Sequence, residues 1–147
     1  MRARDVLAAF PPITSDTPAI EAARLLCEHK APGLIVVDEN GRPYGVLPAI
    51  HVLRLAVPGY CQEDPTLARV IDEPHADHFL DPLEGRTVAE ALRHVSRDLP
   101  VADSEATVLE VAALMARTGS PLVAVVSEGR LIGAVTLQTL LDRVIPQ

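Results

Sequence analysis

The chain repeats one sequence pattern twice along its 147 residues. Residues 18–26 align with residues 107–115 at an offset of 89, which extends to the valine pairs at 36–37 and 125–126. After a one-residue deletion the offset becomes 88, and Leu53 aligns with Leu141. Self-similarity at a fixed spacing predicts two copies of one structural unit. The copies span residues 1–57 and 87–147, with residues 58–86 as a linker.

Each copy contains the same expected series of elements. In the second copy Val108, Val111, Ala112 and Met115 have the spacing of an amphipathic helix. A continuous apolar run, a Gly-containing turn, a return strand and a closing helix follow in both copies, which predicts a β-α-β-β-α unit. A unit of under 60 residues cannot cover its own sheet, so we expect two copies packed with pseudo-twofold symmetry. The predicted fold class is α/β, of the α+β type.

The linker has its own pattern. Asp64 and Pro65 predict the start of a short helix with Leu67, Val70 and Ile71 on one face. We expect this apolar face to pack against the repeat pair, because most apolar stripes are buried. Pro74 predicts the end of the helix, and the rest of the linker is predicted to be a polar connector.

Composition excludes several classes of function. The net charge of −7 and the 3% aromatic content, with no Trp, argue against binding nucleic acid through phosphates or stacked bases. The longest apolar runs are much shorter than a membrane helix, so we expect no membrane insertion. Pro11 and Pro12 interrupt any signal peptide, and two cysteines form no disulfide framework, so we expect a cytoplasmic protein.

The segments 120–126 and 133–136, with their counterparts in the first copy, resemble the tandem cystathionine β-synthase (CBS) domain pair, the Bateman module, here standing alone. The resemblance implies a non-enzymatic regulatory module with an adenine-containing nucleotide (AMP, ADP, ATP or S-adenosylmethionine) in clefts between the repeats. It implies no required cofactor. It also implies a homodimer and a signal passed to a separate effector protein, an enzyme or a transporter.

Ligand residues follow from the same resemblance. The family ends each repeat with Gly-hydrophobic-x-Thr/Ser-x-x-Asp, in which the Asp binds the ribose. Thr136 keeps the hydroxyl, but Thr139 stands where Asp is expected, and Pro48 and His51 occupy these positions in the first copy. His51 and Arg54, one helical turn apart, are candidates to bind an anion. Further ligand contacts that the resemblance implies are Ile13, Thr14, Asp16, Leu34, Ala102, Asp103 and Leu122.

Two alternatives remain open. The replaced ribose carboxylates favour a structural or protein-interaction module whose clefts bind no ligand. A weaker alternative is metal binding through His75 and His78, which could share a zinc with a nearby carboxylate. The chain has no GxSxG, HExxH or P-loop lysine motif, so we expect no catalytic residues.

Overall fold

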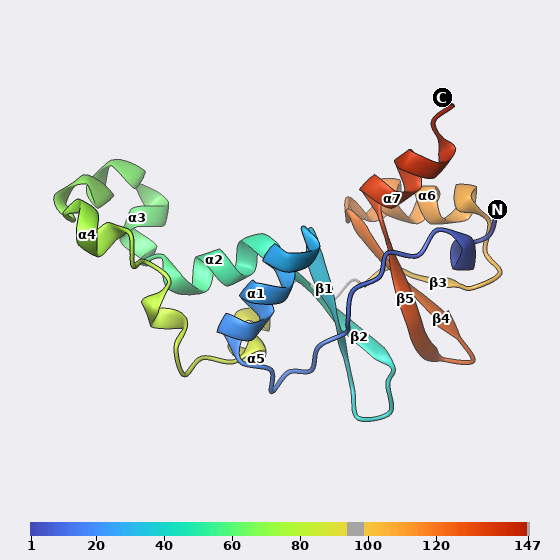
Figure 1. Cartoon of the computed structure of the whole chain (residues 1–147), viewed down its shortest axis with the longest axis horizontal. Helices are drawn as coiled ribbons and strands as arrows, with labels where there is room; N and C mark the ends of the chain where they lie inside the picture. The colour runs from blue at the N-terminus through green and yellow to red at the C-terminus, as the bar shows by residue number, and fades with distance from the viewer. Residues whose placement is uncertain (94–98, 147) are drawn as a thin grey trace.

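The computed structural model describes residues 1–93 and 99–146 and contains two small sheets. The first sheet pairs β1 (Gly33–Val37) with β2 (Pro43–Pro48). The second has the order β3-β4-β5, formed by Val101–Asp103, Leu122–Ser127 and Arg130–Thr136. The helices are η1 (Ala3–Asp5), α1 (Ala19–His29), α2 (Ala49–Ala56), α3 (Gly59–Glu63), η2 (Pro65–Val70), α4 (Glu73–Ala76), η3 (Asp81–Leu83), α5 (Val88–Leu92), α6 (Val108–Thr118) and α7 (Leu137–Val144). Figure 1 shows the two sheets side by side, with both termini beside the second.

The two repeats share one strand register. Leu34 pairs with Leu47 in the first repeat, and the aligned pair in the second is Val123 and Val135. Both antiparallel pairs shift register at the aligned position, after residues 36 and 125. The deletion between the copies therefore lies in the turn that follows, and the predicted α/β fold of two repeats is confirmed.

The first strand of the predicted unit differs between the copies. In the second repeat it is β3, which runs parallel to β4. In the first repeat only Ile13 pairs: its N–H donates to the carbonyl of Ile35 at 3.0 Å, and its carbonyl accepts from Val37 N–H at 2.8 Å. Pro11 and Pro12, just before it, carry no N–H to extend the pairing.

The short helices that begin the two repeats are exchanged between them. Ala3 N–H donates to the carbonyl of Ala106 at 2.8 Å, and Ala3 lies in the core of the second repeat. Val88 N–H donates to the carbonyl of Thr17 at 2.9 Å, and Val88 lies in the core of the first. Each core is thus completed by a segment from the other repeat, which ties the two units into one fold.

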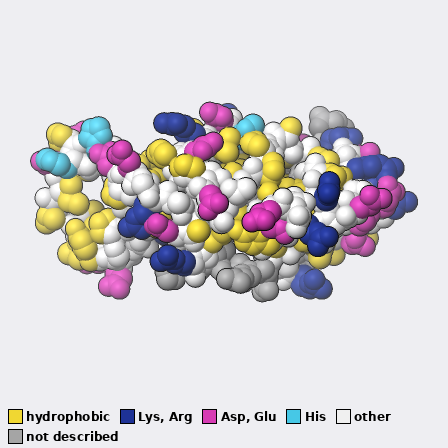
Figure 2. Space-filling view, turned by 90° about the horizontal axis from the view of Figure 1, so that it is seen from below, with side chains coloured by type: hydrophobic (Ala, Val, Ile, Leu, Met, Phe, Trp, Pro, Cys, Tyr) yellow, Lys and Arg dark blue, Asp and Glu magenta, His cyan; other side chains and the backbone are white. Residues whose placement is uncertain are grey.

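The linker does not pack as its sequence predicts. Leu67 and Ile71 are exposed and Val70 is 84% exposed, because α3, η2 and α4 form an excursion that projects beyond α2 (Figure 1). Figure 2 shows the excursion at one end of the molecule, where hydrophobic side chains lie among acidic ones. The structure has two short helices, η2 and α4, where the sequence predicted one. Asp64 caps the start of η2 and Asp72 caps the start of α4, and each helix has a proline in its first turn. Pro74 therefore begins a helix rather than ending one.

Within the described residues, the longest helices have eleven residues, and none has the length and apolar content needed to cross a membrane.

Candidate functional site

Two clefts occupy equivalent positions between the repeats, each beside the closing helix of one repeat. The α2 cleft measures about 990 Å³ and the α7 cleft about 830 Å³, a size that suits small-molecule ligands. The closing helices are held in the same way: Ala49 N–H donates to the carbonyl of Pro32 at 3.0 Å, and Leu137 N–H to that of Pro121 at 2.9 Å. The two clefts are therefore the counterparts that the sequence repeat predicts.

The α2 cleft is lined by residues of both repeats. His51 and Arg54 come from α2, at a spacing that places them on the same side of the helix. Arg117 and Thr118 come from the end of α6, and Ser120 from the segment before β4. The apolar part of the wall consists of Val46, Ile50, Leu99, Val101 and Leu114. The cleft thus combines basic, hydroxyl and apolar groups.

The α7 cleft is lined by Thr136 and Thr139, with Lys30 from the end of α1. The two threonines form a capping box: Thr139 N–H donates to Thr136 Oγ1 at 3.1 Å, and Thr136 N–H donates to Thr139 Oγ1 at 3.0 Å. The hydroxyl oxygens lie 3.0 Å apart, and Thr136 is only 5% exposed. Both hydroxyls are therefore already used in holding the start of α7.

All seven of the other predicted ligand residues lie outside the linings of the two clefts. The side chains of four of them are buried in the cores: Ile13, Leu34, Ala102 and Leu122. Asp103 is exposed and accepts a hydrogen bond from Glu105 N–H. Thr14 and Asp16 line a separate groove of about 470 Å³ beside the β1–β2 turn. In the two clefts the structure therefore brings together His51 with Arg54, and Thr136 with Thr139, and it places the other candidates elsewhere.

Comparison with known proteins identifies the repeated unit. The CBS domain matches residues 3–57 and 87–146. The chain belongs to the CBS-domain family. A CBS domain-containing protein of unknown function from Kribbella flavida is 49% identical over 99% of both chains, with a TM-score of 0.85. A comparison with curated proteins gave no match.

Two more distant structures share the CBS fold and hold ligands. CBSX2 from Arabidopsis thaliana, solved in complex with AMP, is 20% identical; the match covers 97% of this chain and 94% of that one, with a TM-score of 0.66. The CBS domain pair of MJ0100, solved with 5′-methylthioadenosine and S-adenosyl-L-methionine, is 22% identical; the match covers 97% and 94%, with a TM-score of 0.64.

Sequence reasoning missed the half of each cleft that the other repeat supplies. Arg117 and Thr118 face α2 from the second CBS repeat, and Lys30 faces α7 from the first. The segments that end α1 and α6 align with each other in the sequence repeat. That alignment was the available signal, but it does not show that each segment lies beside the closing helix of the other repeat.

Among the described residues, no third side chain joins His75 and His78 in a metal-binding arrangement. His75, in α4, and His78, just after α4, are exposed, and His75 Nδ1 pairs with Asp72 Oδ1 at 2.5 Å. In the described parts of the chain, no three His, Cys, Asp or Glu side chains gather in a metal-binding arrangement. A structural zinc site needs four ligands, so this pair alone does not form one.

Proposed function

We propose that this CBS pair is a cytoplasmic, non-enzymatic regulatory module that binds an adenine-containing nucleotide between its repeats. The candidate ligands are AMP, ADP, ATP and S-adenosylmethionine. The volume of the clefts and their mixed apolar and basic lining support a ligand with a planar base and an anionic group. Relatives of the same fold have been solved with AMP and with S-adenosylmethionine.

The observation that carries the proposal is that each cleft has walls from both repeats. A ligand that contacts α2 also contacts the end of α6, and one that contacts α7 also contacts the end of α1. The binding free energy of such a ligand then depends on the relative arrangement of the repeats. The difference in binding free energy between two arrangements is the only energy available for a signal. We propose that an isologous homodimer passes this signal to a separate enzyme or transporter.

A thermal-shift panel tests the proposal. A ligand at 100 times its dissociation constant stabilises the folded state by about 2.7 kcal/mol. For a chain of this size, each kcal/mol raises Tm by about 2–4 °C, so the expected rise exceeds 5 °C. GMP at equal ionic strength is the control that separates adenine recognition from general phosphate binding. No rise with any of the four adenine compounds would refute the proposal.

A specific observation favours the interaction module as the second candidate. The Thr136–Thr139 capping box uses the hydroxyls that a ribose would otherwise contact. Val70 on the excursion and Phe79 just after it are also exposed, and a protein partner could cover both side chains. If the protein is an interaction module, the thermal-shift panel gives no rise in Tm. Immobilised protein that carries Val70→Asp then binds less of its protein partner than immobilised wild-type protein does.

A further inference from the structure

The excursion formed by α3, η2 and α4 is anchored to the first repeat but has no core of its own. Every residue from 62 to 79 is exposed. At the base of the excursion, Gln62 Nε2 donates to the carbonyl of Val57 at 2.8 Å. Beyond it, Leu83 is fully buried in the core of the first repeat. The excursion therefore projects from the first repeat while both of its ends are held there.

Large apolar side chains lie on this projecting surface. Leu67 and Val70 are three residues apart in η2, a spacing that places them on one face of a 3-10 helix. The exposed large apolar side chains of the linker are Tyr60, Leu67, Val70, Ile71 and Phe79. Figure 2 shows hydrophobic side chains grouped at this end of the molecule. Grouped and exposed apolar side chains mark a surface that another molecule covers.

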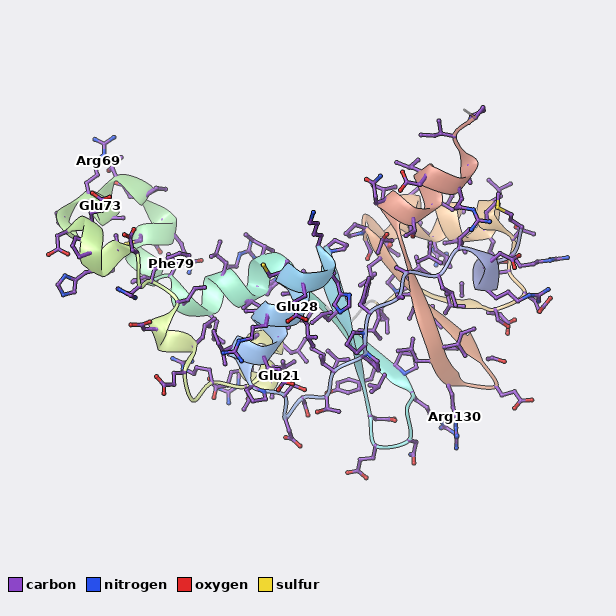
Figure 3. The ribbon with its side chains drawn as sticks, viewed as in Figure 1. Glu21, Glu28, Arg69, Glu73, Phe79 and Arg130 are labelled. Atoms are coloured by element: carbon purple, nitrogen blue, oxygen red, sulfur yellow. The ribbon has the colours of Figure 1, made fainter. Side chains whose placement is uncertain are left out.

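Acidic side chains surround the apolar ones. The linker, residues 58–86, has seven acidic and two basic side chains, so it carries a net charge of −5 out of −7 for the whole chain. Glu63, Glu73 and Asp77 form no ion pair among the described residues. Figure 3 shows Glu73 near the outer end of the excursion and Phe79 nearer to α2. The surface therefore combines apolar groups with unpaired negative charge.

This charge selects among the molecules that could cover the surface. Nucleic acid and anionic membranes are repelled, because both bind through basic groups. The excursion of a second copy is also repelled, because it carries the same charge. Residues 58–80, all of which the structure describes, form helices and turns and contain no strand, so they offer no sheet edge for an added strand. A basic helix with one apolar face complements both the charge and the apolar groups.

We propose that the excursion is a docking surface for a basic amphipathic helix of a partner protein. The apolar face of that helix covers Leu67 and Val70, and its Lys and Arg side chains pair with the acidic groups beside them. This inference rests on the proposed function, in which a signal passes to a separate protein, and names the chemistry of the contact. The excursion is also attached to α2, because Gln62 Nε2 donates to the carbonyl of Arg54 at 3.2 Å. A partner docked there is thus connected to the helix that lines the α2 cleft.

Fluorescence anisotropy with the full chain tests the inference. The probe is a labelled peptide of leucine and lysine, about 18 residues or five turns of helix long, with the leucines on one face. One control peptide has the same composition in shuffled order, without an apolar face. A second control peptide has glutamate in place of lysine. Nucleotide is left out of the titration, so the measurement does not depend on the clefts.

Two variants of the excursion have matched controls at the other end of the molecule. Val70→Ser removes an apolar side chain from η2, and Leu109→Ser does so from the exposed surface of α6. Glu73→Gln removes one unpaired charge from α4, and Glu128→Gln removes one from the β4–β5 turn. Figure 1 shows α6 and this turn far from the excursion.

The expected result is that the leucine–lysine peptide binds with a micromolar dissociation constant, and that both control peptides bind at least tenfold more weakly. Val70→Ser weakens binding about tenfold, the effect of losing one apolar side chain from a covered surface. Glu73→Gln weakens it about threefold, within the range of an exposed ion pair, and makes it less dependent on salt. Leu109→Ser and Glu128→Gln leave the affinity unchanged.

The other outcomes overturn the inference. Equal binding of the shuffled peptide shows attraction by charge alone, without a docking surface. Binding that Val70→Ser leaves unchanged lies elsewhere on the chain, and an absence of binding leaves no site. If Val70→Ser lowers the mass of the free protein in analytical ultracentrifugation, a second copy covers the excursion instead. None of these results affects nucleotide binding, which the thermal-shift panel tests separately.

Discussion

Replacing Val6 by Ala is expected to destabilise the second repeat, although Val6 lies in the first repeat of the sequence. Val6 is 2% exposed and packs in the core that contains Val111 and Val135. The substitution removes two methyl groups, worth about 0.8 kcal/mol each in transfer free energy. The unfilled cavity adds a further cost, so we expect a loss of about 2–3 kcal/mol in the free energy of unfolding.

Urea unfolding followed by far-ultraviolet circular dichroism measures this loss. Val70→Ala is the matched control, because it removes the same atoms at a side chain that is 84% exposed. Its effect is expected to stay within about 0.5 kcal/mol. A loss of less than 0.5 kcal/mol for Val6→Ala would refute the burial of this segment.

Hydrogen exchange locates the effect. The exchanged arrangement predicts that Val6→Ala lowers amide protection in α6, β4 and β5, the elements of the core in which Val6 is buried. If protection falls only in α1, β1 and β2, the segment packs on its own repeat, and the proposed swap of the short N-terminal helices between the repeats is refuted.

Three further predictions concern local features. Thr136→Ala removes the cap of α7 and should cost about 1 kcal/mol in urea unfolding; no loss would contradict the capping box. Gly33→Ala should cost about 1–3 kcal/mol, because its Cβ would lie 2.8 Å from the Leu47 carbonyl oxygen, whereas a Cβ at Gly45 meets nothing within 4 Å and Gly45→Ala is the control. The hydrogen bond from a backbone N–H holds the pKa of Asp5 below its usual value, so its stabilising effect is lost as pH falls. Asp5→Asn should therefore lose less stability than the wild type between neutral and acid pH in unfolding measurements, and equal losses would contradict this.

Local pattern and repetition made much of the fold predictable. The offset change from 89 to 88 predicted where the copies differ in length, and the structure places that change in the turn after Val37 and Val126. The apolar runs became β1 and β4 because buried strands carry continuous hydrophobic sequence. These features depend on residues close together in the chain.

Features that depend on distant contacts were not predictable in this way. The burial of Ala3 against the second repeat requires knowing how the two copies are placed. Arg117 became a candidate only when the end of α6 was seen beside α2. The Leu67–Ile71 stripe has the spacing of a buried face, yet it is exposed, because spacing alone does not show whether another element lies opposite.

Native mass spectrometry of the full chain, with AMP, ADP, ATP or S-adenosylmethionine added in turn, tests most directly whether the clefts hold an adenine-containing ligand. The account predicts a species with at least one of these compounds bound to the wild-type protein. It predicts the same for the control variant Arg130→Gln, because Arg130 is exposed at the β4–β5 turn and lies outside both cleft linings (Figure 3). It predicts a smaller bound fraction of the nucleotides for the double variant Arg54→Gln with Arg117→Gln, because both side chains line the α2 cleft. A wild-type chain that stays free of all four compounds at millimolar concentration would contradict the account.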